Sequence, residues 1–155
     1  MPKKSAGLLL YRTVRGSMEV FLVHPGGPFW ANKDDGAWTI PKGEFSAGEE
    51  ALDAAKREFR EETGLVAEGD FHPLKPIQQR GGKIVYSWAV NIDLDAATVK
   101  SNTFSMEWPC GSGRMREFPE IDRAAWFKID LARRKILKSQ LDLLVQLEQA
   151  VASRQ

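Results

Sequence analysis

The sequence GEFSAGEEALDAAKREFREETGL occupies residues 43–65 and determines how the rest of the chain is interpreted. Within it, Glu58, Glu61 and Glu62 are spaced i, i+3 and i+4, so a helix would carry their three carboxylates on one face. Like charges at this spacing repel one another and require a compensating cation. Tightly grouped oxygen ligands suit Mg²⁺ or Mn²⁺. The stretch therefore predicts a metal site that serves phosphate chemistry.

The same stretch carries signals for the start and the end of a helix. Ser46 and Glu49 match the S-x-x-E capping box, which predicts a helix that begins at Ser46 and runs to about Thr63. Gly64 then supplies a residue that accepts the left-handed conformation of a helix stop. The apolar residues that recur at helical spacing, and that we expect to face the core, are Leu52, Ala55 and Phe59.

Composition and charge limit the class of protein. With 155 residues, 43% of them hydrophobic and 28% charged, the chain can bury a core, and we expect one domain over residues 1–155. The net charge of +1 gives no field that would attract nucleic acid or an anionic membrane, so neither is an expected partner. The lone Cys110 excludes an intramolecular disulfide, and no apolar run is long enough to cross a membrane. These features predict a cytoplasmic protein.

The remaining elements follow from hydrophobic periodicity and turn signals. Residues 5–12 and 18–24 predict a hairpin, and their nearly continuous apolar content indicates a sheet that is covered on both faces. Further short strands are expected at residues 37–40, 83–93 and 124–129, with a turn at 41–43 between the first of these and the helix. Helical spacing appears at residues 131–136 and 141–151. Residues 98–116 are expected to be a long loop with a short strand at 103–107.

A known family shares the arrangement of residues 43–65. The pattern G-x5-E-x7-R-E-Φ-x-E-E-x-G-Φ, where Φ is a bulky apolar residue, resembles the Nudix box, the signature of enzymes that hydrolyse a nucleoside diphosphate linked to another group. The preceding residues 38–44, WTIPKGE, resemble the lead-in of the branches that cleave diadenosine polyphosphates and nucleotides. The resemblance implies an α/β (α+β) fold, a Nudix-type α/β/α sandwich with a mixed β-sheet.

The resemblance also implies roles for individual residues. One carboxylate from outside the box is usually recruited, six residues before a tryptophan that opens a late strand, and Glu120 has this spacing to Trp126; Glu107 and Glu117 are alternatives in the same region. Glu58 is the first choice for the general base, with Glu61 or Glu120 as alternatives. The implied metal ligands are Gly43 (through its carbonyl), Glu58, Glu61, Glu62 and Glu120, with Glu58 and Glu61 as catalytic residues. The implied structural residues of the motif are Glu49, in a salt link to Arg57, together with Arg57 and Gly64.

Several aromatic and basic residues are candidates for contacts with a substrate. Lys42 lies next to the box, and Arg116 lies in the long loop, so both could contact phosphates. Trp38 and Trp88 are expected in the core, because most tryptophans of a small domain pack there. The aromatic residues of the expected loops are the stacking candidates, namely Phe29, Trp30, Phe104 and Trp108.

The resemblance implies Mg²⁺-dependent (or Mn²⁺-dependent) hydrolysis of a phosphoanhydride bond in a small nucleotide. A dinucleoside polyphosphate such as diadenosine tetraphosphate is the first candidate substrate, and a (deoxy)nucleoside triphosphate is the second. A different class would be a non-catalytic nucleotide-binding protein on a decayed scaffold, but that class is expected to lack a glutamate of the box, and none is missing here. The sequence leaves a monomer and a homodimer equally open.

Overall fold

The computed structural model describes residues 3–153, and the ends of the expected domain, residues 1–2 and 154–155, lie outside the described residues. A mixed seven-stranded sheet runs in the order β4-β6-β1-β2-β9, with β3 paired to β1 and β5 paired to β6. Its strands are β1 (Lys4–Val14), β2 (Ser17–Pro25), β3 (Lys42–Glu44), β4 (His72–Pro73), β5 (Ile77–Gln78), β6 (Ile84–Asn91) and β9 (Ile121–Lys128). A second sheet has two strands, β7 (Thr103–Glu107) and β8 (Met115–Pro119).

Strand β1 is the central element, because it pairs with three others. It runs parallel to β6 and antiparallel to β2, while its first half pairs with β3 in the register Ser5↔Glu44 and Gly7↔Lys42. Its apolar side chains alternate between two buried clusters, with Leu8 in one and Leu9 in the other. Both faces of the sheet are therefore covered, as its continuous apolar content predicted.

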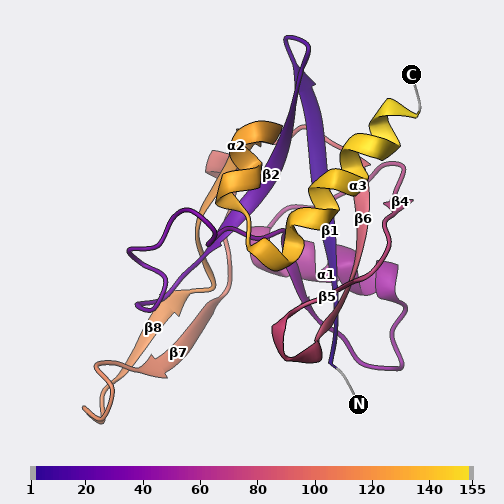
Figure 1. Ribbon diagram of the computed structural model, residues 1–155. Coiled ribbons are helices and arrows are strands. Elements are labelled where there is room, and N and C mark those ends of the chain that lie inside the picture. Colours follow the sequence, from indigo (N-terminus) through magenta and orange to yellow (C-terminus); the bar gives the residue numbers. More distant parts are fainter. Residues whose placement is uncertain (1–2, 154–155) are drawn as a thin grey trace.

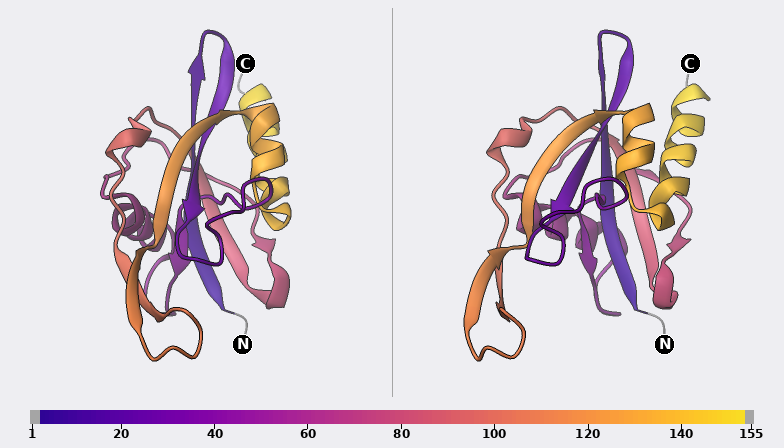
Figure 2. Two further views of the ribbon diagram at one scale, coloured as in Figure 1. Left: turned by 90° about the vertical axis from the view of Figure 1, so that its left-hand side faces the viewer. Right: turned by 60° about the vertical axis from the view of Figure 1, so that its left-hand side comes forward.

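Helices cover the two faces of the sheet (Figures 1 and 2). On one face lies α1 (Ala51–Thr63), which buries Ala55 and Phe59 in the same cluster as Leu8. On the other face lie α2 (Ile129–Lys135) and α3 (Leu141–Ala152), whose Leu143, Leu144 and Leu147 join the cluster of Leu9. Short 3₁₀ turns occur at Arg80–Gly82, Ala96–Thr98 and Lys138–Gln140. The predicted sandwich with a mixed sheet is confirmed. None of the helices within residues 3–153 has the length and hydropathy that a membrane span requires.

The predicted start of the box helix is wrong. The helix begins at Ala51 with Glu50 as an N-cap that makes no side-chain cap hydrogen bond, five residues after the predicted Ser46. Ser46 instead accepts a hydrogen bond from the Glu49 N–H through its backbone carbonyl, at 3.1 Å. The Glu49 side chain turns to Arg57, and a charge-assisted pair is stronger than the reciprocal cap that the sequence suggested. The predicted stop is confirmed, because Gly64 has φ 75° and its N–H donates to the Arg60 carbonyl.

Two further local expectations are corrected. Residues 37–40 do not form a strand of the sheet but only isolated bridges, Val23↔Thr39 and Trp38↔Ile136. Residues 41–43 were expected to be a turn, yet Lys42–Glu44 pairs with β1 as β3. The strand expected at 103–107 within the loop 98–116 is confirmed. Its partner β8, which begins inside this loop and runs beyond it to Pro119, was not predicted. For residues 37–44 the outcome depends on which distant backbone is available for pairing, and local propensity does not encode that. Strand β8 pairs with the strand directly before it, despite its own weak strand propensity.

Candidate functional site

One face of α1 carries Glu58, Glu61 and Glu62 and is here called the carboxylate face. It lies against β3. The Lys42 N–H donates a hydrogen bond of 3.0 Å to Glu62 Oε2. Gly43 lies so close to Glu58 that a Cβ on this residue would meet Glu58 Oε2 at 2.0 Å. Glycine is therefore required at position 43 for the backbone of β3 to pass the Glu58 carboxylate.

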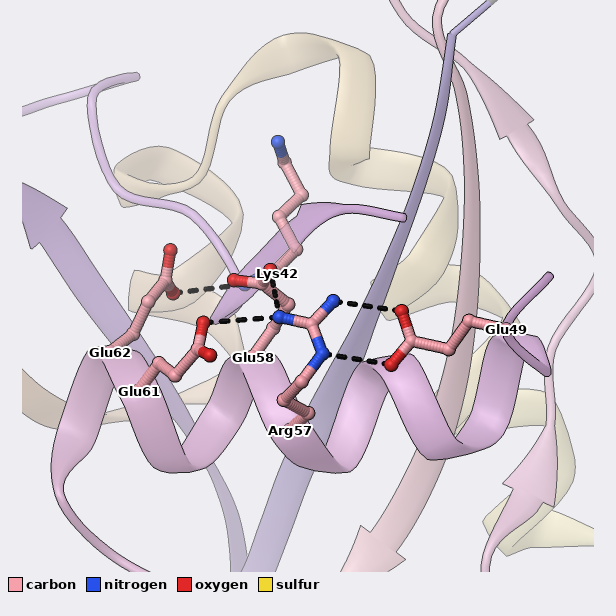
Figure 3. A network of polar contacts seen from close by, with 6 residues as sticks. All are labelled: Lys42, Glu49, Arg57, Glu58, Glu61 and Glu62. Carbon is pink, nitrogen blue, oxygen red and sulfur yellow. Dashed lines mark hydrogen bonds and ion pairs between the residues drawn. The ribbon is translucent and has the colours of Figure 1, made fainter. Parts of the chain in front are cut away.

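Arg57 is the cation that holds this face together (Figure 3). Its guanidinium forms a two-pronged pair with Glu49, with hydrogen bonds of 2.8 and 2.9 Å. Its Nη1 donates to Glu58 Oε1 at 2.9 Å and to Glu61 Oε2 at 3.1 Å. The hydrogen bonds with Glu49 raise the pKa of Arg57 and lower the pKa of Glu49. The expected salt link between Glu49 and Arg57 is thus present, and Arg57 also separates two of the clustered carboxylates.

The glutamates affect one another electrostatically. Burial raises the pKa of Glu62 to about 8, and the charges of Glu58 and Glu120 add to this effect against the hydrogen bond from Lys42. Burial also raises the pKa of Glu58 above its ordinary value, although Arg57 opposes this shift. Partial burial and the charge of Glu61 raise the pKa of Glu120. Four acidic side chains therefore share one region and repel one another in the absence of a further cation.

Glu120 reaches this region from a distant part of the chain. It lies between β8 and β9, where its N–H donates to the Asn102 carbonyl at 2.8 Å and its carbonyl accepts from the Gly26 N–H at 2.9 Å. The alternatives lie elsewhere: Glu107 binds the Gly111 N–H at the tip of the β7–β8 hairpin, and Glu117 is exposed on β8. Of the three candidates, Glu120 is the one whose charge contributes to the raised pKa values of the box glutamates Glu58 and Glu62.

The donor set fits a divalent cation, but it is not arranged as a finished site. Carboxylate oxygens are hard ligands of the kind that Mg²⁺ prefers. The pKa values of Glu58 and Glu62 are raised, and a bound cation would stabilise their charged forms. The absence of a side chain at Gly43 lets the backbone of β3 lie directly beside the Glu58 carboxylate. Within residues 3–153, however, no three acidic, histidine or cysteine side chains converge on a single point that could hold a metal. Arg57 Nη1 lies between Glu58 and Glu61, so metal binding requires these side chains to turn.

A cavity of about 860 Å³ lies between the loop after β2 and the turn before β6. Its three basic side chains are Arg80, Lys83 and Lys138, and its one aromatic side chain is Trp30. Lys83 also pairs with Glu44 of β3 at 3.3 Å. The cavity is lined by Trp30, Asp35, Gly36, Gln79, Arg80, Lys83, Leu137, Lys138 and Ser139.

The three expected substrate contacts do not come together. Trp30 lines the cavity, whereas Arg116 lies on the β7–β8 hairpin, 5.8 Å from the ring of Phe118. Lys42 extends away from the carboxylates of α1 (Figure 3), and burial, together with the charge of Lys83, lowers its pKa. Trp38 is buried as expected, and Trp88 is only partly buried against the cluster around α1.

His24, which is not among the site residues expected from the sequence, links the loop after β2 to the segment that follows Glu120. It is fully buried, and its ring nitrogens lie 2.7 Å from Asp122 Oδ1 and 2.6 Å from the Lys33 carbonyl oxygen. The ladder between β2 and β9 shifts register between His24 and Pro25, next to Ile121. A bulge of this kind redirects the chain, here directly after Glu120. Only the buried apolar run before His24 could have indicated this position, because its partners are distant in sequence.

Comparison with known families identifies the chain. A model of the NUDIX domain matches residues 1–147. The chain belongs to the NUDIX domain family. The NUDIX signature recognised in residues 43–65 is therefore confirmed, and the carboxylate face described above is the helix of that signature.

Individual relatives agree with this assignment. Over 68 residues the chain is 37% identical to the asymmetrical bis(5'-nucleosyl)-tetraphosphatase of Caenorhabditis elegans, and this match spans 44% of the chain and 45% of that protein. The chain therefore matches less than half the length of this curated relative. A crystal structure of a C. elegans Ap4A hydrolase binary complex superposes with a TM-score of 0.67 and 25% identity, covering 97% of this chain and 98% of that one. A MutT/nudix family protein from Listeria innocua shares the fold, with a TM-score of 0.66, 17% identity and coverage of 99% and 97%.

Proposed function

We propose that this NUDIX protein is a divalent-metal-dependent hydrolase that cleaves a phosphoanhydride bond of a nucleoside polyphosphate, with diadenosine tetraphosphate (Ap4A) as the first substrate. The observation that carries the proposal is the carboxylate face of α1, where Arg57 bridges Glu58 and Glu61 and a Cβ on Gly43 would meet Glu58 at 2.0 Å. Glu120 lies close enough to add to the raised pKa values of Glu58 and Glu62, and a divalent cation would relieve this concentration of carboxylates. A curated relative and a solved structure, both from C. elegans and both with names that specify cleavage of such compounds, support the substrate class.

The chain's own groups have distinct roles in this reaction. The proposed metal ligands are Glu58, Glu61, Glu62 and Glu120 with the Gly43 carbonyl, and Mg²⁺ or Mn²⁺ there would neutralise the polyphosphate and lower the pKa of water. Glu58 is the proposed general base, since burial raises its pKa toward the range in which a carboxylate accepts a proton. Glu61 and Glu120 are the alternative bases. Arg57 orients Glu58 and Glu61 through its hydrogen bonds, and Glu49 fixes Arg57.

The cavity beside Trp30 supports binding of one nucleoside phosphate. Its volume of about 860 Å³ lies within the range of small-ligand sites. Trp30 offers a ring for stacking on a base, while Arg80, Lys83 and Lys138 offer positive charge to phosphates. Lys42 neighbours Lys83 and is joined through its backbone to Glu62, so it connects the cavity to the carboxylates. We propose that the Lys42 side chain contacts a phosphate of the bound substrate.

A (deoxy)nucleoside triphosphate is the second candidate substrate. The observation that favours it is that the cavity contains one aromatic residue, Trp30, which suffices for a single nucleoside. Cleavage would then release a monophosphate and pyrophosphate. A small nucleotide remains the only partner that we propose. The cytoplasmic location stays a prediction from the sequence, and the sequence leaves monomer and homodimer open.

The experiment that tests the function is a chromatographic screen with Mg²⁺. Purified protein is incubated with diadenosine tetraphosphate, nucleoside triphosphates, nucleotide sugars, diphosphoinositol phosphates and capped RNA, and the products are separated. We expect metal-dependent cleavage of the dinucleoside compound and none in EDTA. If it stays intact while another compound is consumed, the substrate proposal is wrong. If every compound stays intact, the proposal of a hydrolase is wrong.

A further inference from the structure

The hairpin of β7 and β8 carries residues that the proposed hydrolysis does not use. It forms a sheet of its own that projects away from the main sheet (Figures 1 and 2). The Trp108 N–H donates to the Arg114 carbonyl at 3.0 Å, which adds one pair to the ladder beyond Glu107↔Met115. Side chains alternate between the faces of a strand, so every second residue shares a face. The face in question, here called the aromatic–arginine face, consists of Phe104, Met106, Trp108, Arg114, Arg116 and Phe118.

The two faces of this hairpin differ in chemistry. On the aromatic–arginine face, Phe104 and Phe118 stand directly opposite each other with ring centroids 6.0 Å apart, and both are half-buried. On the other face, Ser105 stands opposite Glu117, and both are exposed. A hairpin with one apolar face and one polar face usually packs its apolar face against another part of the protein or a ligand. Among the described residues, no strand of the main sheet pairs with this hairpin.

The loop after β2 packs against this face. Gly27, at φ 98°, approaches Phe104 so closely that a Cβ would lie 2.9 Å from the end of its ring. Phe29 meets Trp108 edge to face, at 5.7 Å between centroids and 78° between planes. Much of the Phe29 side chain remains accessible to a ligand, because the residue is 59% exposed. Two perpendicular rings thus form a corner on which a third planar ring can stack.

Positive charge lies on the same face of the hairpin as Trp108. Arg116 lies over the ring of Phe118, with 5.8 Å between its guanidinium carbon and the ring centroid. Neither Arg114 nor Arg116 forms an ion pair with any residue in the described part of the chain, 3–153. Aromatic rings interleaved with arginine are the composition of surfaces that stack bases and hold phosphates.

The corner is tied to both parts of the candidate site. Glu120 directly follows β8, and its carbonyl accepts from the Gly26 N–H at the start of the loop. The next aromatic residue of the same loop, Trp30, lines the cavity of about 860 Å³. Two adjacent residues therefore belong to different sites: Phe29 packs at the corner with Trp108, and Trp30 lines the cavity. The loop that carries both residues begins beside Glu120.

We propose that Phe29 and the aromatic–arginine face form a second nucleoside subsite, which takes the far end of a dinucleoside polyphosphate. The far base stacks on Phe29 and Trp108, and Arg114 and Arg116 hold the phosphate next to it. This proposal rests on the proposed function and makes it more specific, because it explains how the chain would distinguish a substrate with two nucleosides from one with a single nucleoside.

The test compares Phe29→Ala with Met115→Ala, a control on the opposite face of the same hairpin. Both residues are exposed, so neither change removes a buried contact. KM is measured for diadenosine tetraphosphate and for ATP with Mg²⁺. Loss of one stacking partner should raise the ratio of the first KM to the second about tenfold in Phe29→Ala. In Met115→Ala the ratio should stay within a factor of two of wild type. Arg116→Gln should shift the ratio in the same direction as Phe29→Ala.

An unchanged ratio in both Phe29→Ala and Arg116→Gln would overturn the subsite. So would tighter binding of a single-stranded oligonucleotide than of diadenosine tetraphosphate through the same residues. If wild type cleaves neither nucleotide, the proposed function fails, and calorimetric binding of a methylene-bridged diadenosine tetraphosphate analogue then decides the subsite. Weaker binding in Phe29→Ala than in Met115→Ala supports it, and equal binding contradicts it.

Discussion

The carboxylate face of α1 and the β7–β8 hairpin would both contact substrate, yet they are built in different ways. Most of the carboxylate face comes from one short stretch, in which Arg57, Glu58 and Glu61 are already neighbours through helical spacing. The hairpin forms its corner only because Phe29, far away in sequence, packs against Trp108. Under the proposed function, the residues assigned to the chemistry are brought together by local spacing, whereas those assigned to substrate choice are brought together by long-range packing.

The largest effect is expected at the carboxylate face, from Glu58→Gln. The change keeps the shape of the side chain while it removes the proposed base and a metal ligand. We expect kcat to fall roughly 10²- to 10⁴-fold, measured by product formation with saturating Mg²⁺. Glu50→Gln is the matched control, because Glu50 is exposed and precedes the helix. Turnover like that of wild type in Glu58→Gln would show that the chemistry is located elsewhere.

The next effect is expected from Gly43→Ala. The added methyl group would collide with the Glu58 carboxylate, which must then move away from β3. A displacement of this size should lower kcat/KM about 10²-fold. Gly48→Ala is the control, since nothing lies within 4 Å of a Cβ at that position. Equal activities of the two variants would mean that the close approach of Gly43 to Glu58 has no catalytic importance.

The burial of Glu62, together with the neighbouring negative charges, should be visible in the metal-free protein as a pH dependence of stability. The folded protein holds a proton on Glu62 up to a pKa of about 8, whereas the unfolded chain releases it near 4.5. The folded state therefore binds more protons between these values, and the free energy of unfolding must fall as pH rises from about 4.5 to about 8. The total is on the order of 5 kcal/mol. Urea unfolding in EDTA measures this slope, which Glu62→Gln should flatten. A free energy that rises across this pH window would contradict the burial of an unneutralised carboxylate.

The smallest effect is expected from Arg116→Ala on stability. The side chain is exposed and lies on a hairpin that does not pair with the main sheet. We expect the free energy of unfolding to stay within about 0.5 kcal/mol of wild type. A loss of several kcal/mol in thermal or urea unfolding would mean that the hairpin supports the fold rather than the substrate.

The sequence predicted those features of the site that depend on neighbours along the chain. Helical spacing correctly placed Phe59 in the core, and Gly64 ended the helix as expected. The salt link between Glu49 and Arg57 was also predicted. The same local signals failed at Ser46, because Glu49 has a stronger partner in Arg57 than in a helix N-terminus.

Features that depend on distant partners were less accessible. Lys42 and Gly43 were expected in a turn, and only their pairing with β1 makes them a strand. The charged and proline-containing Met115–Pro119 has weak strand propensity, so its pairing with β7 was not predicted. His24 lies in a buried apolar run, and nothing in its spacing pointed to Asp122. Glu120 was selected as a candidate only because the family resemblance supplied its spacing from Trp126.

The most direct test of the central claim is calorimetric titration of Mn²⁺ into the wild-type protein and into Glu58→Gln, each with and without a nucleotide. If grouped carboxylates hold divalent cations against a polyphosphate, wild type takes up the ion, the nucleotide strengthens the uptake, and the variant binds more weakly by at least tenfold. Absence of uptake by wild type under both conditions, or equal affinity in the two proteins, would contradict the account.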